Sequence, residues 1–338
     1  MKTPKHILVI RLSAMGDVAM VVPVLYAFAK AYPDIKLTVL AKPFFEPILQ
    51  TIPDINVIPA LVDTSHKGAT GLWQLSRELK KLKIDAVADL HNVLRSKILR
   101  SFLRIPSAII DKGRADKKRL TGQKNKVFKQ LSTTISRYQK VFEELSFLDF
   151  QPETLPVPNQ SEAVYHFMEG HSGKWIGIAP FAAHPGKEYP QDLMKKILEG
   201  LDGEKDTRLV LFGAPNDAER LKKLAISCSQ FRIAAGVLSF EDEINLISQL
   251  DVMLAMDSGN AHLAAMYGIP TVTLWGVTHP YSGFAPFKQA HHCLLSDQEE
   301  YPLIPTSVYG NKLPSGYENV MRTISPSQVI TKIKKILQ

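Results

Sequence analysis

Short runs of apolar residues alternate along the chain with longer stretches in which apolar residues recur every three or four positions. The runs predict buried β-strands, and the stretches predict helices with one apolar face. Because strands that alternate with helices form parallel sheets covered on both faces, the pattern predicts an α/β fold. In the first half we expect strands at residues 6–10, 36–40, 56–59 and 86–90, and helices at 17–31, 73–83 and 136–147.

A proline-rich stretch interrupts this alternation near the middle of the chain. Residues 151–160 contain three prolines, which is typical of an interdomain linker. The alternation then resumes, so we expect a second domain of the same kind. Its predicted strands are 175–179, 208–212, 252–255 and 270–275, and its predicted helices are 191–201, 217–227, 240–249 and 260–267.

The chain of 338 residues therefore divides into two domains and a tail. Residues 1–155 and 170–324 are predicted to form two doubly wound, Rossmann-like domains. In residues 325–338, Ser325 and Pro326 suit a helix start, and an apolar stripe follows them. We expect this terminal helix to pack back on the N-terminal domain.

The composition narrows the cellular setting. The chain has two cysteines, Cys228 and Cys293, which are far apart in the sequence. This spacing argues against a disulfide scaffold and a structural zinc site, and it is typical of a reducing compartment. The N-terminal apolar run is too short for a signal peptide, and no apolar stretch approaches the length of a membrane-spanning helix. We therefore expect a cytoplasmic protein that is soluble or peripheral to a membrane.

The net charge of +8 is unevenly distributed along the chain. Between Lys112 and Lys129, eight residues are basic and one is acidic. Such a segment attracts nucleic acid, an anionic bilayer or a phosphorylated acceptor, or it is simply a solvated charge run. One aromatic residue, Phe128, lies among the basic ones, and no helix-turn-helix, RNP or zinc-finger motif occurs. Nucleic acid is therefore the less favoured partner.

Ligands of open parallel sheets bind beyond the carboxyl ends of the strands, so the loops after the predicted strands are the candidate sites. In the first loop, the carboxylate of Asp17 either faces a ligand in the crevice or caps a helix. In a later loop, Ser258 and Gly259 begin a helix whose amides suit a phosphate. His262 on its first turn is either a hydrogen-bonding group for that anion or a core histidine.

Two further loops carry weaker signals. Lys187 follows the strand at 175–179 and is a candidate partner for a phosphate, although a lone loop lysine is usually only solvated. Asp217 or Glu219, after the next strand, is a candidate for binding a ribose hydroxyl. The chain lacks the patterns G-x-G-x-x-G, G-x-x-x-x-G-K-[ST], H-E-x-x-H and G-x-S-x-G. Their absence disfavours dinucleotide-binding enzymes, P-loop NTPases, zinc hydrolases and serine hydrolases.

Taken in order, these loops resemble the bacterial ADP-heptose:lipopolysaccharide heptosyltransferases, a family of glycosyltransferases. The matching segments are 11–18 (RLSAMGDV), 89–96 (DLHNVLRS), 187–190 (KEYP), 212–215 (FGAP) and 257–262 (DSGNAH), the last followed by 268–276 (GIPTVTLWG). The resemblance implies a GT-B fold of two facing Rossmann-like domains. It also implies an inverting transfer of heptose from ADP-heptose to a lipopolysaccharide inner-core acceptor.

The resemblance further implies a role for each candidate residue. Asp17 would be the general base for the acceptor hydroxyl, while Lys187 and the amides of Ser258 and Gly259 would hold the diphosphate without a metal. Asp257 would shape that loop. The implied donor-side residues are Lys187, Asp257, Ser258, Gly259, His262 and Glu219. The implied acceptor-side residues are Ser13, Arg95, Arg114, Lys117, Lys118 and Arg119.

The implied partners are a nucleotide-sugar donor, an anionic lipopolysaccharide-core acceptor and the cytoplasmic surface of the inner membrane, on which the basic segment would dock. No metal, other cofactor or nucleic acid is expected. Two alternatives stay open at this point. One is another nucleotide-sugar transferase or an epimerase of the same fold, and the other is a basic nucleic-acid-binding protein.

Overall fold

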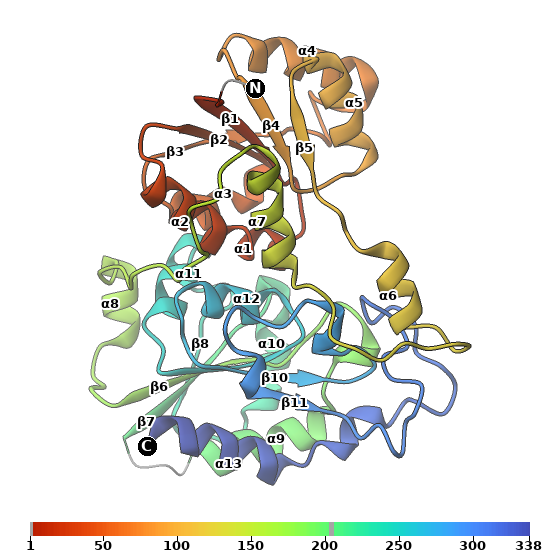
Figure 1. The fold of residues 1–338 in the computed structure, drawn as a ribbon. Helices are drawn as coiled ribbons and strands as arrows, with labels where there is room; N and C mark the ends of the chain where they lie inside the picture. The colour runs from red at the N-terminus through yellow and green to blue at the C-terminus, as the bar shows by residue number, and fades with distance from the viewer. Residues whose placement is uncertain (1–2, 203–205) are drawn as a thin grey trace. The chain divides into compact units, whose positions relative to one another are not determined.

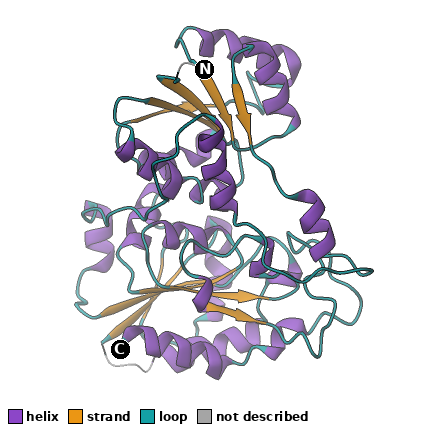
Figure 2. Ribbon diagram, viewed as in Figure 1, coloured by secondary structure: helices purple, strands orange, loops and turns teal. Residues whose placement is uncertain are grey.

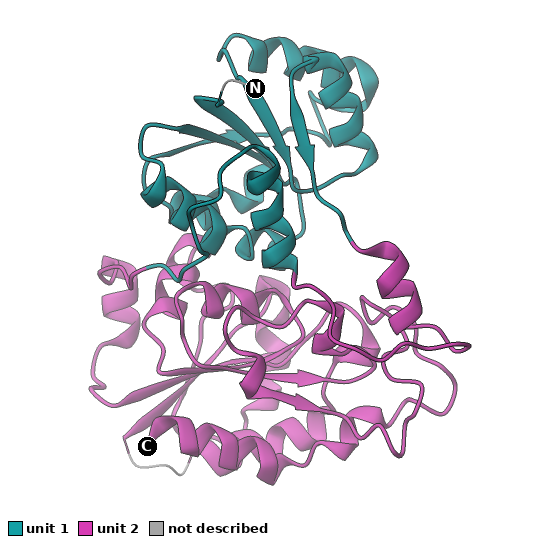
Figure 3. Cartoon of the chain, in the orientation of Figure 1, with its two compact units in different colours: residues 1–112, 134–155 teal, residues 113–133, 156–338 magenta. Residues whose placement is uncertain are grey.

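The chain forms two compact α/β units, each built around its own parallel sheet (Figure 1, Figure 2). The computed structural model describes residues 3–202 and 206–338. The first unit comprises Met1–Lys112 and Thr134–Leu155, and the second comprises Gly113–Thr133 and Pro156–Gln338 (Figure 3). The last change of unit, after Leu155, falls within the predicted linker.

The sheet of the first unit has the strand order β3-β2-β1-β4-β5, with every neighbouring pair parallel. Chain order therefore reverses between β1 and β4. Because crossovers between parallel strands are right-handed, the helices before the reversal cover one face and those after it cover the other. The strands are β1 (His6–Ile10), β2 (Lys36–Ala41), β3 (Ile55–Pro59), β4 (Ala86–Asp89) and β5 (Ser107–Ile109).

The helices of the first unit follow this rule (Figure 1). One face is covered by α1 (Met15–Ala19), α2 (Val22–Ala31), α3 (Glu46–Gln50) and α7 (Thr134–Glu144), and the other by α4 (Gly68–Lys80) and α5 (Leu94–Leu103). Leu8 and Ile10 of β1 pack in one buried cluster with Leu72 and Leu75 of α4 and Leu99 of α5. Side chains alternate along a strand, so Ile7 and Val9 face the opposite layer.

An aromatic cluster joins the two sequence segments of the first unit. The ring of Phe28 on α2 lies 4.7 Å from that of Phe142 on α7 and 5.0 Å from that of Phe147. Phe150 and Tyr32 complete the cluster. The segment 134–155 is thus tied to the first unit by buried apolar contacts.

The sheet of the second unit has the order β11-β10-β9-β6-β7-β8 and is also parallel throughout. Here chain order reverses between β6 and β9. The strands are β6 (Lys174–Ala179), β7 (Thr207–Leu211), β8 (Phe231–Ile233), β9 (Val252–Met256), β10 (Thr271–Trp275) and β11 (Cys293–Leu295). The helices are α6 (Arg114–Leu120), α8 (Glu162–Met168), α9 (Gln191–Asp202), α10 (Ala218–Leu224), α11 (Phe240–Ser248), α12 (Gly259–Met266) and α13 (Pro326–Leu337).

The terminal helix is where the sequence predicts it, but its packing differs from the prediction. We expected residues 325–338 to pack back on the N-terminal domain. Instead α13 packs against α9 of the second unit (Figure 1), and Val329 and Ile333 lie in the core of that unit. The apolar stripe predicts that one face of the helix is buried, but it does not identify the helix against which that face packs.

The basic segment also lies elsewhere than expected. We placed residues 112–129 in the N-terminal domain, but Gly113–Thr133 belongs to the second unit. Lys126 donates hydrogen bonds to the carbonyls of Leu303 and Ile304, both at 2.7 Å, and to that of Pro305. The amide of Leu131 donates to the carbonyl of Tyr281. These bonds fasten the segment to loops of the second unit.

Each predicted strand and helix has a counterpart in the structure, and the elements without a prediction are mostly short, except α5 with its 10 residues. The predicted helix 17–31 is two helices, α1 and α2, and Pro23 occupies the first turn of α2 because it lacks an N–H to donate. Helix α4 begins at Gly68, before its predicted start at residue 73. Within the described residues, the elements without a prediction are α3, α5, α6, α8, β5, β8, β11 and the 3-10 turns Pro43–Phe45, Pro185–Lys187, Pro215–Asp217, Pro280–Ser282, Ala290–His292 and Val320–Thr323.

Candidate active site

The point at which chain order reverses is the expected ligand site of a doubly wound sheet. In the first unit this point lies between the carboxyl ends of β1 and β4, because these neighbouring strands continue in opposite directions across the sheet. The loop after β1 carries Arg11 and Ser13 and leads into α1, whose first turn carries Asp17, and the loop after β4 carries His91. The structure thus brings the predicted base and the 89–96 segment to adjacent strand ends.

Asp17 is held by a buried arginine. Arg11 Nη2 lies 2.5 Å from Asp17 Oδ2, and Arg11 Nη1 donates to the carbonyl of Leu90 at 2.9 Å. The Arg11 side chain is 7% exposed, whereas that of Asp17 is 27% exposed. The hydroxyl of Tyr138 on α7 donates to the backbone carbonyl of Asp17. The carboxylate is therefore oriented from the protein side and remains accessible to a ligand.

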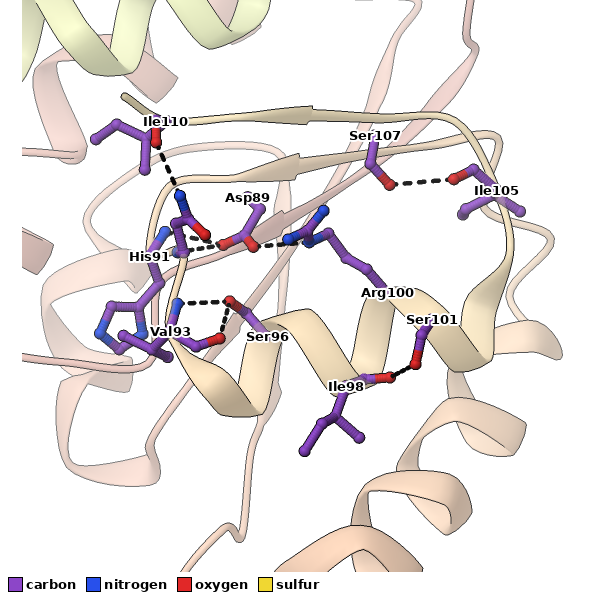
Figure 4. Close-up of polar contacts among 11 residues, drawn as sticks. Asp89, His91, Val93, Ser96, Ile98, Arg100, Ser101, Ile105, Ser107 and Ile110 are labelled. Carbon is purple, nitrogen blue, oxygen red and sulfur yellow. Dashed lines mark hydrogen bonds and ion pairs between the residues drawn. The ribbon is translucent and has the colours of Figure 1, made fainter. Parts of the chain in front are cut away.

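The loop after β4 is shaped by a buried acid (Figure 4). Asp89 is fully buried, and its Oδ1 accepts hydrogen bonds from the amides of His91, at 3.0 Å, and Asn92, at 2.7 Å. Its Oδ2 lies 2.9 Å from Nε of Arg100 on α5. Because the turn is closed by a charged acceptor and an ion pair, we infer a structural role for Asp89 and Arg100.

His91 joins the two loops of this site. Its Nδ1 accepts a hydrogen bond from the amide of Leu12 at 3.3 Å. Burial, together with the nearby charges of Arg11, Lys112 and Arg95, lowers the pKa of His91 to about 3. The imidazole is therefore neutral near pH 7 and can accept this bond. The sequence placed His91 in a family segment without giving it a role, because this contact spans two loops far apart in the chain.

The predicted acceptor-side residues divide between the two units. Ser13 is half-buried in the loop that carries Asp17. Arg95, at the start of α5, is exposed and lies 3.5 Å from Asp63. They follow strands β1 and β4, respectively, at the carboxyl edge of the first sheet, where open parallel sheets bind their ligands.

Arg114, Lys117, Lys118 and Arg119 lie on α6, which belongs to the second unit. Lys117 is buried, with its ammonium 4.1 Å from the ring centre of Phe284. Arg119 pairs with its neighbour Asp116, and Arg114 and Lys118 are exposed. The premise that these four residues belong to the N-terminal domain is therefore wrong.

In the second unit, the reversal lies between β6 and β9, and the loops after these strands meet through an ion pair. Lys187 Nζ, after β6, lies 2.9 Å from Asp257 Oδ2, after β9. The side chains are 15% and 8% exposed. Thr278, in the loop after β10, donates its hydroxyl to the same carboxylate at 2.9 Å. Sequence reasoning found Lys187 and Asp257 separately and missed Thr278, although it follows the next strand of the sheet.

Glycines allow the loops around Lys187 to approach closely. Gly310 has φ of +79°, and a Cβ there would lie 2.3 Å from Cδ of Lys187. A Cβ on Gly186 would lie 2.5 Å from a methyl of Val277. Any side chain at these positions would displace the lysine or the loop that carries it. The position of the ammonium group is thus set by backbone packing.

The serine at the N-cap position of α12 makes no capping hydrogen bond. Ser258 is the N-cap residue, but its side chain accepts no bond from the helix amides. Its hydroxyl is buried and has no hydrogen-bond partner within the described part of the chain. By contrast, Ser161, Ser239 and Ser325 cap α8, α11 and α13 with side-chain bonds to backbone amides. The first amides of α12 and the hydroxyl of Ser258 are therefore suited to an anionic ligand.

Two other donor-side predictions have different outcomes. His262 is buried in the first turn of α12, close in sequence to Asp257 and Ser258. Glu219 is three-quarters exposed on α10 and pairs with Lys222 at 2.8 Å. It follows β7, one strand away from the reversal point, and its ion pair is with Lys222 rather than with Lys187.

Neither a metal cluster nor a membrane span is found in the residues that the structure describes. Within 3–202 and 206–338, no group of three or more His, Cys, Asp or Glu side chains is arranged to hold a metal ion. In the same residues, no helix combines the length and the apolar character needed to cross a bilayer. An anion at the second site would meet the ammonium group of Lys187 and the neutral N–H donors at the start of α12.

The family model of glycosyltransferase family 9 (heptosyltransferase) matches residues 72–309. The chain belongs to this family. Among curated relatives of this glycosyltransferase, the lipopolysaccharide core heptosyltransferase OpsX of Haemophilus influenzae is 25% identical, over 99% of this chain and 98% of the relative. Lipopolysaccharide heptosyltransferase 2 of Escherichia coli is 23% identical over 98% of both chains.

Solved structures share the fold of this family 9 enzyme. A family 9 glycosyltransferase from Veillonella parvula superposes with a TM-score of 0.78 at 20% identity, covering 98% of this chain and 97% of the other. The ADP-heptose lps heptosyltransferase II of E. coli gives a TM-score of 0.72 at 20% identity over 98% of both chains. The predicted fold, two Rossmann-like domains of the GT-B type with a C-terminal helix, is confirmed.

Proposed function

We propose that this glycosyltransferase moves a heptose from ADP-heptose to a sugar of the lipopolysaccharide inner core, with inversion at the anomeric carbon. The names of its relatives support this substrate class. They are lipopolysaccharide heptosyltransferases, and E. coli relatives of the same fold have been solved with ADP and with ADP-2-deoxy-2-fluoro heptose. The resemblance of the ordered loops supports the same conclusion.

The observation that carries the proposal is the Lys187–Asp257 pair beside the uncapped start of α12. A diphosphate bound at these amides would attract Lys187 away from Asp257, whose carboxylate still accepts the hydroxyl of Thr278. The negative charge on the leaving ADP increases as the bond to the sugar breaks. Preorganised amides and an ammonium stabilise that charge.

On the acceptor side, Asp17 is the proposed general base. Its carboxylate takes the proton of the acceptor hydroxyl as the oxygen attacks the anomeric carbon from the face opposite the diphosphate. The new glycosidic bond forms, the sugar–phosphate bond breaks, and ADP leaves with the bonding electrons. Arg11 orients the carboxylate through Oδ2. Ser13 and Arg95 are proposed to contact the acceptor.

The proposed acceptor also suggests where the enzyme works. Lipopolysaccharide inner-core precursors are lipid-anchored and anionic, so we propose a peripheral position at the cytoplasmic face of the inner membrane. Because Lys187 and backbone amides are the proposed partners of the diphosphate, we further propose that transfer needs no divalent metal. Full turnover in the presence of a chelator, compared with added Mg²⁺, checks this statement.

A panel of nucleoside diphosphates tests the donor. Thermal shift and calorimetry with ADP, UDP and GDP should show preferential binding of ADP, and ADP-heptose with a lipopolysaccharide-core acceptor should give product. A strong preference for UDP would contradict the donor assignment. Incubation with ADP-heptose alone separates the epimerase alternative, because an epimerase changes the sugar without an acceptor and a transferase does not.

A further inference from the structure

The outer side of α4 carries a concave, basic surface that the proposed reaction does not use. An open cavity of about 600 Å³ lies between the loop before the helix and its exposed side. We call its cationic and aromatic lining the α4 basic face. It consists of Lys67, Trp73, Arg77 and Lys81, all of them exposed.

Trp73 is the unusual member of this face. Its side chain is 51% exposed, whereas Trp175 and Trp275 are 3% and 1% exposed. The guanidinium of Arg77 lies over its ring, 5.1 Å from the centre. An indole that is half in water and bordered by cations matches the boundary between lipid headgroups and hydrocarbon, where tryptophan is enriched.

The charge around Trp73 is one-sided. Five exposed basic residues occur between positions 67 and 83, namely Lys67, Arg77, Lys80, Lys81 and Lys83. The exposed acid on this helix, Glu78, is already engaged, because it accepts a hydrogen bond from Gln74 and lies 3.5 Å from His66. The surface is therefore complementary in charge to an anionic bilayer.

The α4 basic face reaches the edge of the sheet that carries the proposed base. Lys67 and the start of α4 follow the carboxyl end of β3, just as Asp17 follows the carboxyl end of β1 in the same sheet. A bilayer bound along α4 would thus lie next to the edge at which the first unit is proposed to receive its lipid-anchored acceptor.

We propose that the α4 basic face docks the first unit on an anionic phospholipid bilayer, with Trp73 at the level of the headgroups. The proposal rests on the proposed function in one respect, because a lipid-anchored acceptor is the reason for such docking. It replaces the basic segment as the docking surface. In that segment Lys117 is buried against Phe284, and Lys126 is bonded to backbone carbonyls.

Trp73 supplies the measurement. Vesicles of phosphatidylglycerol and phosphatidylcholine are added to the full chain, and tryptophan emission and co-sedimentation are recorded. Since the other two tryptophans are buried, a blue shift reports on Trp73. We expect the shift with the anionic vesicles, its loss in Trp73→Phe, and no shift with phosphatidylcholine alone.

Matched charge variants locate the surface. A basic residue near an anionic bilayer changes affinity by about five-fold, so Arg77→Gln/Lys81→Gln should weaken vesicle binding by roughly 25-fold. The control Lys124→Gln/Lys129→Gln removes the same charge from exposed positions of the basic segment and should bind like the parent. Greater loss in the control than in the α4 variant overturns the proposal, as does tighter binding to duplex DNA than to the vesicles.

Nucleotide binding separates the two proposals. ADP binding by the α4 variant should equal that of the parent, and so should its turnover with a deacylated, water-soluble acceptor. If the parent protein binds ADP but does not bind the anionic vesicles, only the docking surface is contradicted. Vesicle binding without ADP binding would contradict only the proposed donor.

Discussion

The two reversal points differ in which member of an ion pair is the more buried, the cation or the acid. Each holds an ion pair between a basic and an acidic side chain at the carboxyl edge of a parallel sheet. In the first unit the cation, Arg11, is the more buried member, and the acid is accessible. In the second unit the acid, Asp257, is the more buried member, although Lys187 is also largely covered.

This difference fits the two tasks proposed for the two units. The proposed proton acceptor, Asp17, needs an accessible carboxylate, and the first unit holds Arg11 on its buried side. The proposed phosphate partner, Lys187, has to turn to its ligand, and the second unit holds it on the buried acid Asp257. Neutralising the accessible member of each pair should therefore affect a different step.

The largest effect is expected at Asp17. Asp17→Asn keeps the size of the side chain and removes the proposed base, so kcat should fall by about 1000-fold, within the usual range for general-base catalysis. The affinity for ADP, measured by calorimetry, should not change. Glu153→Gln is the control, because this acid of the first unit pairs with Lys30 at the surface. Undiminished kcat in Asp17→Asn would show that Asp17 is not the base.

Lys187→Ala should act on donor binding. A hydrogen bond to a charged group contributes about 1.5–3 kcal/mol, so the Kd for ADP should rise by roughly 10- to 100-fold. Lys222→Ala removes an exposed lysine of the same unit that pairs with Glu219, and it should leave the Kd unchanged. Equal effects of the two substitutions would contradict a special position for Lys187. A large effect of Glu219→Gln on ADP binding would restore Glu219 as a donor contact.

The histidine at the first reversal point makes stability depend on pH. His91 has a folded pKa of about 3 and an ordinary unfolded value of 6.5, so between these values the unfolded chain binds more protons. Stability is therefore lost as the pH falls below 6.5, by about 1–2 kcal/mol from this residue at pH 5. In His91→Gln the urea-unfolding free energy should change less over this range. A slope identical to that of the parent would contradict the assigned pKa direction.

The smallest effects come from two serines that occupy equivalent helix positions. Ser239 caps α11, so Ser239→Ala should cost about 1 kcal/mol of unfolding free energy. Ser258 makes no capping bond, so Ser258→Ala should change stability by less than about 0.5 kcal/mol. ADP affinity should fall a few-fold in the Ser258 variant alone. Equal destabilisation by both substitutions would show that Ser258 caps its helix.

The sequence predicts the strands and the candidate residues that follow them better than it predicts which side chains contact those residues. Buried strands are continuous apolar runs, and the segments that follow them contain Asp17, Lys187 and Asp257, so the two candidate sites can be located without coordinates. The partners Arg11, His91 and Thr278 are found only in the structure, because their contacts join loops that are distant in the chain or follow neighbouring strands.

Charge patterns predict even less about burial. The run of basic residues indicates a solvated, polyanion-binding segment, yet Lys117 lies against an aromatic ring and Lys126 against three carbonyls. Long lysine side chains bury their methylene groups while their ammonium groups find specific partners. Which lysine does so depends on loops at positions 279–305, and composition carries no information about those contacts.

The aromatic cluster around Phe28 has a consequence for the order in which the protein matures. The helix that supplies Phe142 to the first sheet follows the basic segment in the chain, so the ribosome must synthesise 113–133 before this sheet receives its last layer. A nascent chain halted at residue 112 would present the apolar surface of α2 to solvent and to chaperones. Completion of the first unit therefore waits until a segment of the second unit has been translated.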